Sequence, residues 1–158
     1  MASNGNPASG FNQLQKIVNF AIEKEQESAD FYTNLAGKVK TRSIAEELKK
    51  LADMEIQHRE RLRKMDPAAA SSAPARNVAD LKIADYVVRA EPTPEMSWQE
   101  ILTIAMHREM ATMKLYQDLA ALVPEGPTRQ MFTHLAAEES GHKLYFERIW
   151  DDEILIEN

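Results

Sequence analysis

The sequence predicts an all-α protein, a four-helix bundle made of two repeated helical hairpins. Three observations lead to this fold class. Four segments carry apolar residues at helical spacing, the second half of the chain repeats the first at a fixed offset, and a long proline-containing segment separates the halves. The chain has 158 residues, so we expect one domain, residues 1–158.

The first two helices are predicted from apolar spacing and from a start signal. Residues 11–39 carry one continuous apolar stripe, which is typical of a helix that packs against a core. Residues 43–65 are predicted as the second helix. Ser43 and Glu46 have the spacing of a capping box at its start.

The third and fourth helices repeat this arrangement. Residues 97–123 begin with a second capping box, Ser97 with Glu100, and proline and glycine residues follow the segment and stop it. Residues 128–150 are predicted as the fourth helix.

A long crossover is predicted between the second and third helices. Residues 66–96 contain four prolines and are much longer than an ordinary helix–helix loop. Such a length suits a chain that returns along the bundle, so that the third helix begins at the same end as the second. Within it, residues 80–88 are amphipathic and are expected to make two helical turns.

The repeat has a constant offset of 84 positions in both helices of each hairpin. Each half therefore has one glutamate on its first helix and a Glu-x-x-His pair on its second. The repeated polar residues are Glu25, Glu55 and His58 in the first half, and Glu109, Glu139 and His142 in the second.

All six repeated polar residues lie in step with the apolar stripes and are predicted to face the core. An ionised carboxylate in a core is costly unless it is paired or bound to metal, and no lysine or arginine lies in step with these positions. Four glutamates supply four negative charges, which two divalent cations would balance. The pattern therefore predicts a two-metal centre of iron, with manganese or zinc as alternatives.

Four other acids and histidines are predicted not to bind the metals. Glu23 and His107 occupy corresponding positions of the repeat, on the polar faces of their helices. His134 is expected to be exposed. Glu138 precedes a predicted ligand but corresponds to Met54, so we expect it at the surface or beside the ligands.

Composition and charge exclude several other functions. A net charge of -6 without a basic stripe argues against nucleic-acid binding. No apolar run approaches the length of a membrane span, and the N-terminus lacks a signal-peptide pattern, so a cytoplasmic protein is expected. The absence of cysteine removes disulfides, iron–sulfur clusters and thiolate zinc sites.

With these motifs the sequence resembles the rubrerythrin branch of the ferritin-like superfamily across all four predicted helices. The resemblance implies a ferritin-like bundle with two iron ions. It implies Glu25 and Glu109 as terminal or bridging ligands, with one Glu-x-x-His pair on each iron. It also implies that Tyr32 and Tyr116 hydrogen-bond the ligand carboxylates, although packing in the core would equally account for both tyrosines.

Two features depart from the rubrerythrin pattern. The chain has no cysteines and hence no rubredoxin-like domain, so electrons would have to come from a separate donor protein. Rubrerythrins also have a further glutamate three residues after the third-helix ligand, where this chain has Thr112.

The leading hypothesis from the sequence is a di-iron oxidoreductase that reduces hydrogen peroxide or dioxygen with electrons from an external donor protein. Two alternatives remain: an iron-storage ferroxidase in a multisubunit cage, and a redox-silent bundle with zinc at the same ligands. For an oxygenase, the sequence indicates no large apolar pocket. A homodimer is expected, and the long crossover would allow hairpins to be exchanged between chains.

Overall fold

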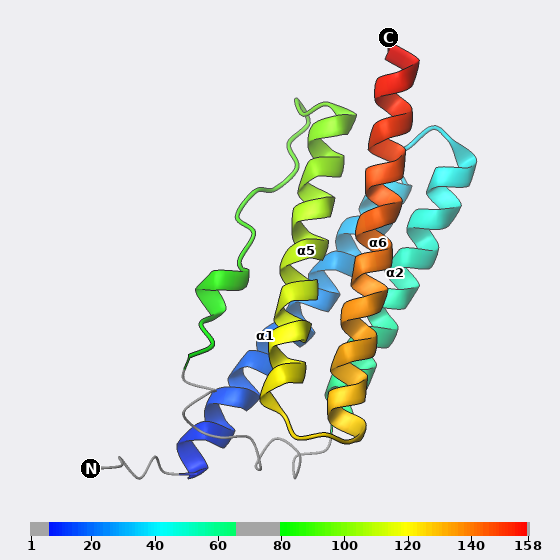
Figure 1. Cartoon of the computed structure of the whole chain (residues 1–158). Coiled ribbons are helices and arrows are strands. Elements are labelled where there is room, and N and C mark those ends of the chain that lie inside the picture. Colours follow the sequence, from blue (N-terminus) through cyan, green and yellow to red (C-terminus); the bar gives the residue numbers. More distant parts are fainter. Residues whose placement is uncertain (1–6, 66–79, 158) are drawn as a thin grey trace.

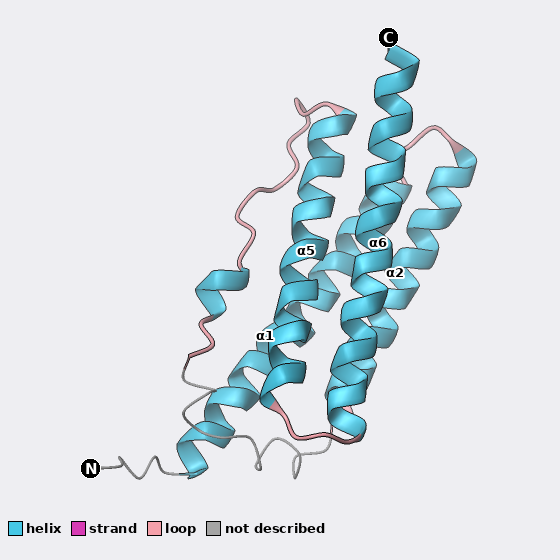
Figure 2. Cartoon of the chain, viewed as in Figure 1, coloured by secondary structure: helices cyan, strands magenta, loops and turns pink. Residues whose placement is uncertain are grey.

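The fold is described from a computed structural model of the chain, for residues 7–65 and 80–157. These two ranges form four long α-helices and one short 3₁₀ helix, without any strand (Figures 1 and 2). The elements are α1 Pro7–Ala36, α2 Arg42–Arg63, η1 Ile83–Tyr86, α5 Trp98–Leu122 and α6 Pro127–Glu157. The all-α, four-helix bundle predicted from the sequence is confirmed. Within the same two ranges, no helix has an apolar stretch long enough to span a bilayer.

The bundle is built from two hairpins, α1 with α2 and α5 with α6, and most contacts between helices lie within a hairpin. Figure 1 shows residues 80–97 climbing alongside α5 to its start, so that α5 begins at the same end of the bundle as α2. This path confirms the crossover between the hairpins. Residues 66–79 of the predicted crossover lie outside the described part of the chain.

The core consists of two apolar clusters, and every long helix contributes to both. The cluster towards one end of the bundle includes Leu14, Leu62, Leu119 and Phe132. The cluster towards the other end includes Leu35, Leu48, Leu102 and Phe146. On every helix, the predicted metal ligands fall between the residues of the first cluster and those of the second. The bundle is therefore apolar, polar and apolar again along its length.

Two helices extend beyond their predicted bounds. α1 begins at Pro7 instead of residue 11, and α6 begins at Pro127, since proline is preorganised for the first turn of a helix. α6 also continues to Glu157 instead of ending at residue 150, because no glycine or proline follows Trp150.

α1 ends earlier than the predicted residue 39. After Ala36, the amides of Gly37 and Lys38 donate to the carbonyls three residues before them, at 3.2 and 3.0 Å. These bonds have the 3₁₀ pattern, which tightens the last turn and ends the helix. The remaining helix ends shift by about one or two positions, the usual uncertainty of an end inferred from sequence.

The expectation of two helical turns over residues 80–88 is wrong. Only η1 forms there, and the backbone is extended at Lys82 and Val87 on either side of it. Tyr86 is the buried residue of this turn, and its hydroxyl donates to Asp118 Oδ2 on α5 at 2.6 Å. A single turn is enough to position the Tyr86 side chain, whose hydrogen bond holds the crossover against α5.

Of the two predicted capping boxes, only the second is formed. Ser97 Oγ accepts from the amide of Glu100 at 3.2 Å, and Glu100 Oε2 accepts from the amide of Ser97 at 2.7 Å. The prediction for Ser43 is wrong, because α2 begins at Arg42 and Ser43 lies inside its first turn. Glu46 instead accepts from the Arg42 side chain at 2.9 Å.

Replacing Ser97 by Ala is expected to lower the free energy of unfolding by about 1 kcal/mol, because the substitution removes a formed cap. Urea denaturation followed by circular dichroism measures the change. Ser43→Ala is the matched control and should alter stability by less than about 0.5 kcal/mol. Equal losses for the two variants would contradict this assignment of the caps.

Candidate metal centre

Six buried polar side chains meet in the middle of the bundle, between the two apolar clusters. α1 and α5 contribute one each, and α2 and α6 contribute two each. They are the six residues predicted from the sequence: Glu25, Glu55, His58, Glu109, Glu139 and His142. Each is at most 4% exposed. The repeat therefore does bring its polar positions together in one layer.

The polar atoms of the layer form two overlapping groups, each compact enough to hold one ion. The first group is Glu25, Glu55, His58 and Glu139, and the second is Glu55, Glu109, Glu139 and His142. In each group, one atom per residue lies within 4.8 Å of the others. Glu55 and Glu139 belong to both groups, so their carboxylates are placed to be shared between two ions. Glu25 and Glu109 each belong to one.

Both histidines point their Nδ1 atoms into the layer. His58 Nδ1 lies 2.7 Å from Glu139 Oε1 and 3.3 Å from Glu55 Oε2. His142 Nδ1 lies 3.0 Å from Glu55 Oε1 and 3.6 Å from Glu139 Oε2. The rings are nearly parallel, 5.9 Å apart between centroids with 10° between planes. Nδ1 is therefore the nitrogen that each imidazole could offer to an ion.

The two buried tyrosines connect the hairpins. Tyr32 donates to Glu109 Oε1, and Tyr116 donates to Glu25 Oε1. Each hydroxyl thus reaches the glutamate of the opposite hairpin, while its ring packs in an apolar cluster. Burial, and next the nearby carboxylates, raise the pKa of both hydroxyls well above the usual value, so they remain protonated donors.

Protonation is shared across the layer when no metal is bound. Burial, followed by the charge of Glu55, raises the pKa of Glu25 well above its usual value, and burial with the neighbouring carboxylates does the same for Glu139. Burial alone would lower the pKa of the histidines. Hydrogen bonds to the carboxylates outweigh this effect and raise the pKa of both, to about 12 for His142. Groups that could bind metal therefore carry protons.

The donor set of the layer fits two divalent cations. Among the described residues, three buried polar side-chain atoms lack a hydrogen-bond partner, and all belong to this layer: Glu55 Oε2, Glu109 Oε2 and His142 Nε2. A buried oxygen without a partner is costly, and a cation beside it would remove that cost. The two oxygens lie 3.3 and 3.6 Å from the Nδ1 atoms of His58 and His142 respectively. Each such oxygen–nitrogen pair could share an ion.

The four acids and histidines that were predicted not to bind metal lie mostly where the sequence analysis expects them. Glu23, His107 and His134 are exposed. For Glu138 the sequence allowed either a surface position or a position beside the ligands. The structure shows the second, since Glu138 Oε2 lies 2.5 Å from His58 Nε2. Its adjacency to Glu139 was the only sequence signal for this contact, because the corresponding residue in the first hairpin is Met54.

A small cavity lies on the α1–α5 side of the layer. Its volume is about 20 Å³, which is room for one water-sized molecule. Ser28 and Thr112 line it, one turn beyond Glu25 and Glu109 respectively, and Tyr86 of the crossover forms part of its wall. The hydroxyl of Thr112 donates to the carbonyl of Arg108 at 3.0 Å.

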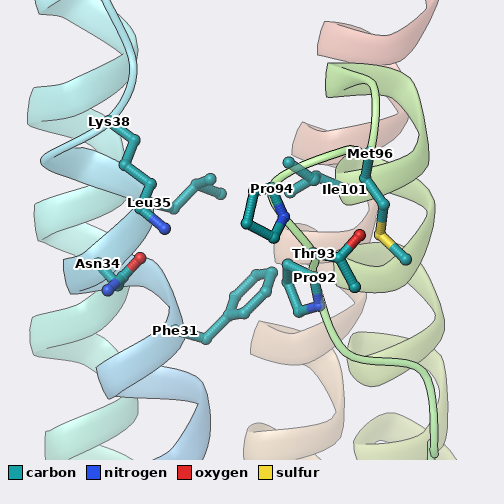
Figure 3. A pocket seen from close by; sticks show the side chains of 9 residues that line it. All are labelled: Phe31, Asn34, Leu35, Lys38, Pro92, Thr93, Pro94, Met96 and Ile101. Atoms are coloured by element: carbon teal, nitrogen blue, oxygen red, sulfur yellow. The ribbon is translucent and has the colours of Figure 1, made fainter.

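A larger cavity of about 550 Å³ lies away from the layer (Figure 3). Figure 3 shows Phe31 and Leu35 of α1 facing Pro92 and Pro94 of the crossover. None of the six clustered residues lines this cavity. The sequence did not indicate it, and it does not open onto the candidate metal centre.

Comparisons with known proteins agree with the fold. A family model described as Rubrerythrin matches residues 16–150. None of the curated protein sequences matches the chain. The fold is similar to the crystal structure of a Thermotoga maritima protein described as a ferritin-like diiron-carboxylate protein. The TM-score is 0.71 and the sequence identity 22%, and the match covers 89% of this chain and 95% of that one.

Substituting Glu25 by Gln is expected to stabilise the metal-free protein by about 1 kcal/mol, because burial disfavours the ionised carboxylate that the substitution removes. The same variant should bind divalent metal more weakly. Urea denaturation after treatment with a chelator measures the first effect. Glu23→Gln, on the exposed face of the same helix, should change neither property. A less stable metal-free Glu25→Gln protein would contradict the prediction.

Metal binding is expected to release protons, because both histidines, Glu25 and Glu139 have raised pKa values in the metal-free protein. Affinity for Zn²⁺ should therefore fall as the pH is lowered. Isothermal titration calorimetry in two buffers of different ionisation enthalpy measures the release. The same apparent enthalpy in both buffers would show that no protons leave.

Proposed function

Because the chain belongs to the rubrerythrin family, we propose that it is a di-iron oxidoreductase that reduces hydrogen peroxide or dioxygen. The observation that carries the proposal is the layer of four glutamates and two histidines, divided into two groups that share Glu55 and Glu139. Oxygen and imidazole donors with shared carboxylates suit a pair of iron ions. Manganese would fit the same donors.

The six residues of the layer are the proposed ligands. Two ferrous ions there would supply the two electrons that, with two protons, convert hydrogen peroxide to two water molecules. The chain itself contributes the surroundings of that reaction. The apolar clusters on both sides exclude bulk water, and Nδ1 of each histidine faces its group of carboxylates.

Tyr32 and Tyr116 are proposed to orient ligands. Each hydroxyl donates a hydrogen bond to Oε1 of a glutamate in the opposite hairpin. This leaves Oε2 of that carboxylate for an ion. The raised pKa of both hydroxyls keeps them donors throughout the neutral range. Their role is thus to hold Glu109 and Glu25 in one orientation.

The small cavity between α1 and α5 lies one helical turn beyond Glu25 and Glu109, and none of the six proposed ligands lines it. It has room for about one water-sized molecule, and the hydroxyls of Ser28 and Thr112 line it beside the charged side chains of Lys24 and Arg108. Such a lining favours a small molecule that forms hydrogen bonds, as hydrogen peroxide does.

An external protein is the proposed source of electrons. The chain has no cysteine, so it provides no thiolate or iron–sulfur group to carry electrons to the layer. The peroxidase cycle would then require a reduced partner for each turnover. An iron-storage ferroxidase would instead require a hollow assembly of many subunits, and a structural bundle would hold zinc.

The proposed reaction is tested by loading the metal-free protein with ferrous iron under anaerobic conditions. Mixing with hydrogen peroxide in a stopped-flow instrument should give rapid growth of ferric absorbance, with two irons oxidised per peroxide. Glu55→Ala should slow this growth by about tenfold or more, because it removes a shared ligand. Glu23→Ala is the matched control and should oxidise as the unaltered protein does.

Three outcomes would contradict the proposal. Absent or very slow oxidation by both peroxide and dioxygen would exclude a redox centre of this kind. Zinc alone in elemental analysis of natively purified protein would favour the structural bundle. A particle of several hundred kilodaltons in light scattering, with iron beyond the two ligated ions, would favour storage.

A further inference from the structure

We propose that Glu138 positions His58 from outside the layer and makes the two metal positions unequal. The ion beside His58 would bind first and more tightly than the ion beside His142. The inference rests on the proposed function, since it takes the six-residue layer as the metal-binding centre.

The outer nitrogen of His58 has a carboxylate partner. While Nδ1 faces the layer, Nε2 lies 2.5 Å from Glu138 Oε2. The hydrogen on Nε2 can donate to this carboxylate, which leaves Nδ1, the nitrogen that faces Glu25, Glu55 and Glu139, as the one that would bind an ion. Glu138 thus selects the tautomer that can bind an ion and holds the ring in one orientation.

Glu138 is itself held in place. Its Oε2 also accepts from Arg61 Nη1 at 3.2 Å, and its Oε1 lies 3.6 Å from His134 Nε2. Its side chain is 23% exposed, whereas that of His134 is 72% exposed. Contacts from both α2 and α6 therefore keep the carboxylate facing His58.

The second imidazole lacks such a partner. His142 Nε2 is buried and makes no hydrogen bond within the described residues. The difference arises where the two halves of the 84-residue repeat diverge. The position corresponding to Glu138 is Met54, whose thioether is a poor acceptor. The position corresponding to Arg61 is Tyr145, so the pair of carboxylate and guanidinium that flanks His58 has no counterpart beside His142.

This difference should appear in metal affinity. A carboxylate on the outer nitrogen strengthens an imidazole as a donor, and removal of such a partner typically weakens metal binding by about 10- to 100-fold. The two groups otherwise have the same donors. Each consists of one glutamate that belongs to that group alone, the two shared glutamates and one histidine. The Glu138 carboxylate beside His58 is therefore the feature expected to make the affinities of the two metal positions differ.

Two substitutions within the repeat test the proposal. Glu138→Met makes the second hairpin like the first, and Met54→Glu makes the first like the second. Zn²⁺ is titrated by calorimetry into each metal-free protein, because it is redox-silent and binds the same donors. The unaltered protein should show two steps that differ by about tenfold or more in affinity.

Each variant should change one binding step. Glu138→Met should weaken the tighter step by about tenfold or more and leave the other nearly unchanged, so the steps converge. Met54→Glu should tighten the weaker step. A Glu138→Met protein that keeps the original ratio, or that loses affinity equally in both steps, would overturn the inference. Thermal unfolding of the metal-free variants confirms that they fold.

A spectroscopic measurement reports on the hydrogen bond itself. With Co²⁺ bound, the unaltered protein should show one slowly exchanging, hyperfine-shifted imidazole N–H resonance, from His58. Glu138→Met should abolish its protection from exchange, and Met54→Glu should add a second such resonance. Two protected resonances in the unaltered protein would contradict the asymmetry. Failure to bind Zn²⁺ or Co²⁺ at all would instead remove the proposed metal centre, and this inference with it.

Discussion

Charge balance in a buried layer is the constraint on which the structure depends. Four carboxyl groups lie at the centre of the bundle, each nearly inaccessible to water, and apolar clusters close the layer on both sides. Four ionised carboxylates could not remain there unaided, since burial and mutual repulsion both oppose it. Protons, two imidazoles and two tyrosine hydroxyls reduce the cost, and a pair of cations would balance it fully.

The same constraint joins the two halves of the molecule. Packing contacts lie mostly within each hairpin, whereas the tyrosines and histidines of the layer form hydrogen bonds between the hairpins. Tyr32 reaches Glu109, Tyr116 reaches Glu25, and each histidine approaches a carboxylate of the other half. The interior polar groups therefore set the register of one hairpin against the other, a task that interchangeable apolar contacts perform less specifically.

Sequence patterns predicted those features that depend on one helix at a time. A constant offset identified the four glutamates and two histidines, because polar residues rarely recur on an apolar stripe at a fixed spacing unless they act together. The partner of a given side chain on another helix was not accessible from periodicity alone. Periodicity places Tyr32 on a face without indicating that it reaches Glu109, and it could not decide between a surface position and a contact for Glu138. Ser43 had the spacing of a cap, but α2 begins one residue before it.

The crossover has a consequence for how such a centre can change over evolution. If the two hairpins were separate identical chains paired about a twofold axis, every substitution would appear on both sides of the layer. Because one continuous chain carries both halves, a codon for position 54 can diverge from the codon for position 138. Duplication followed by fusion thus converts an obligatorily symmetric centre into one whose halves are inherited independently. Met54 and Glu138 are a difference of this kind.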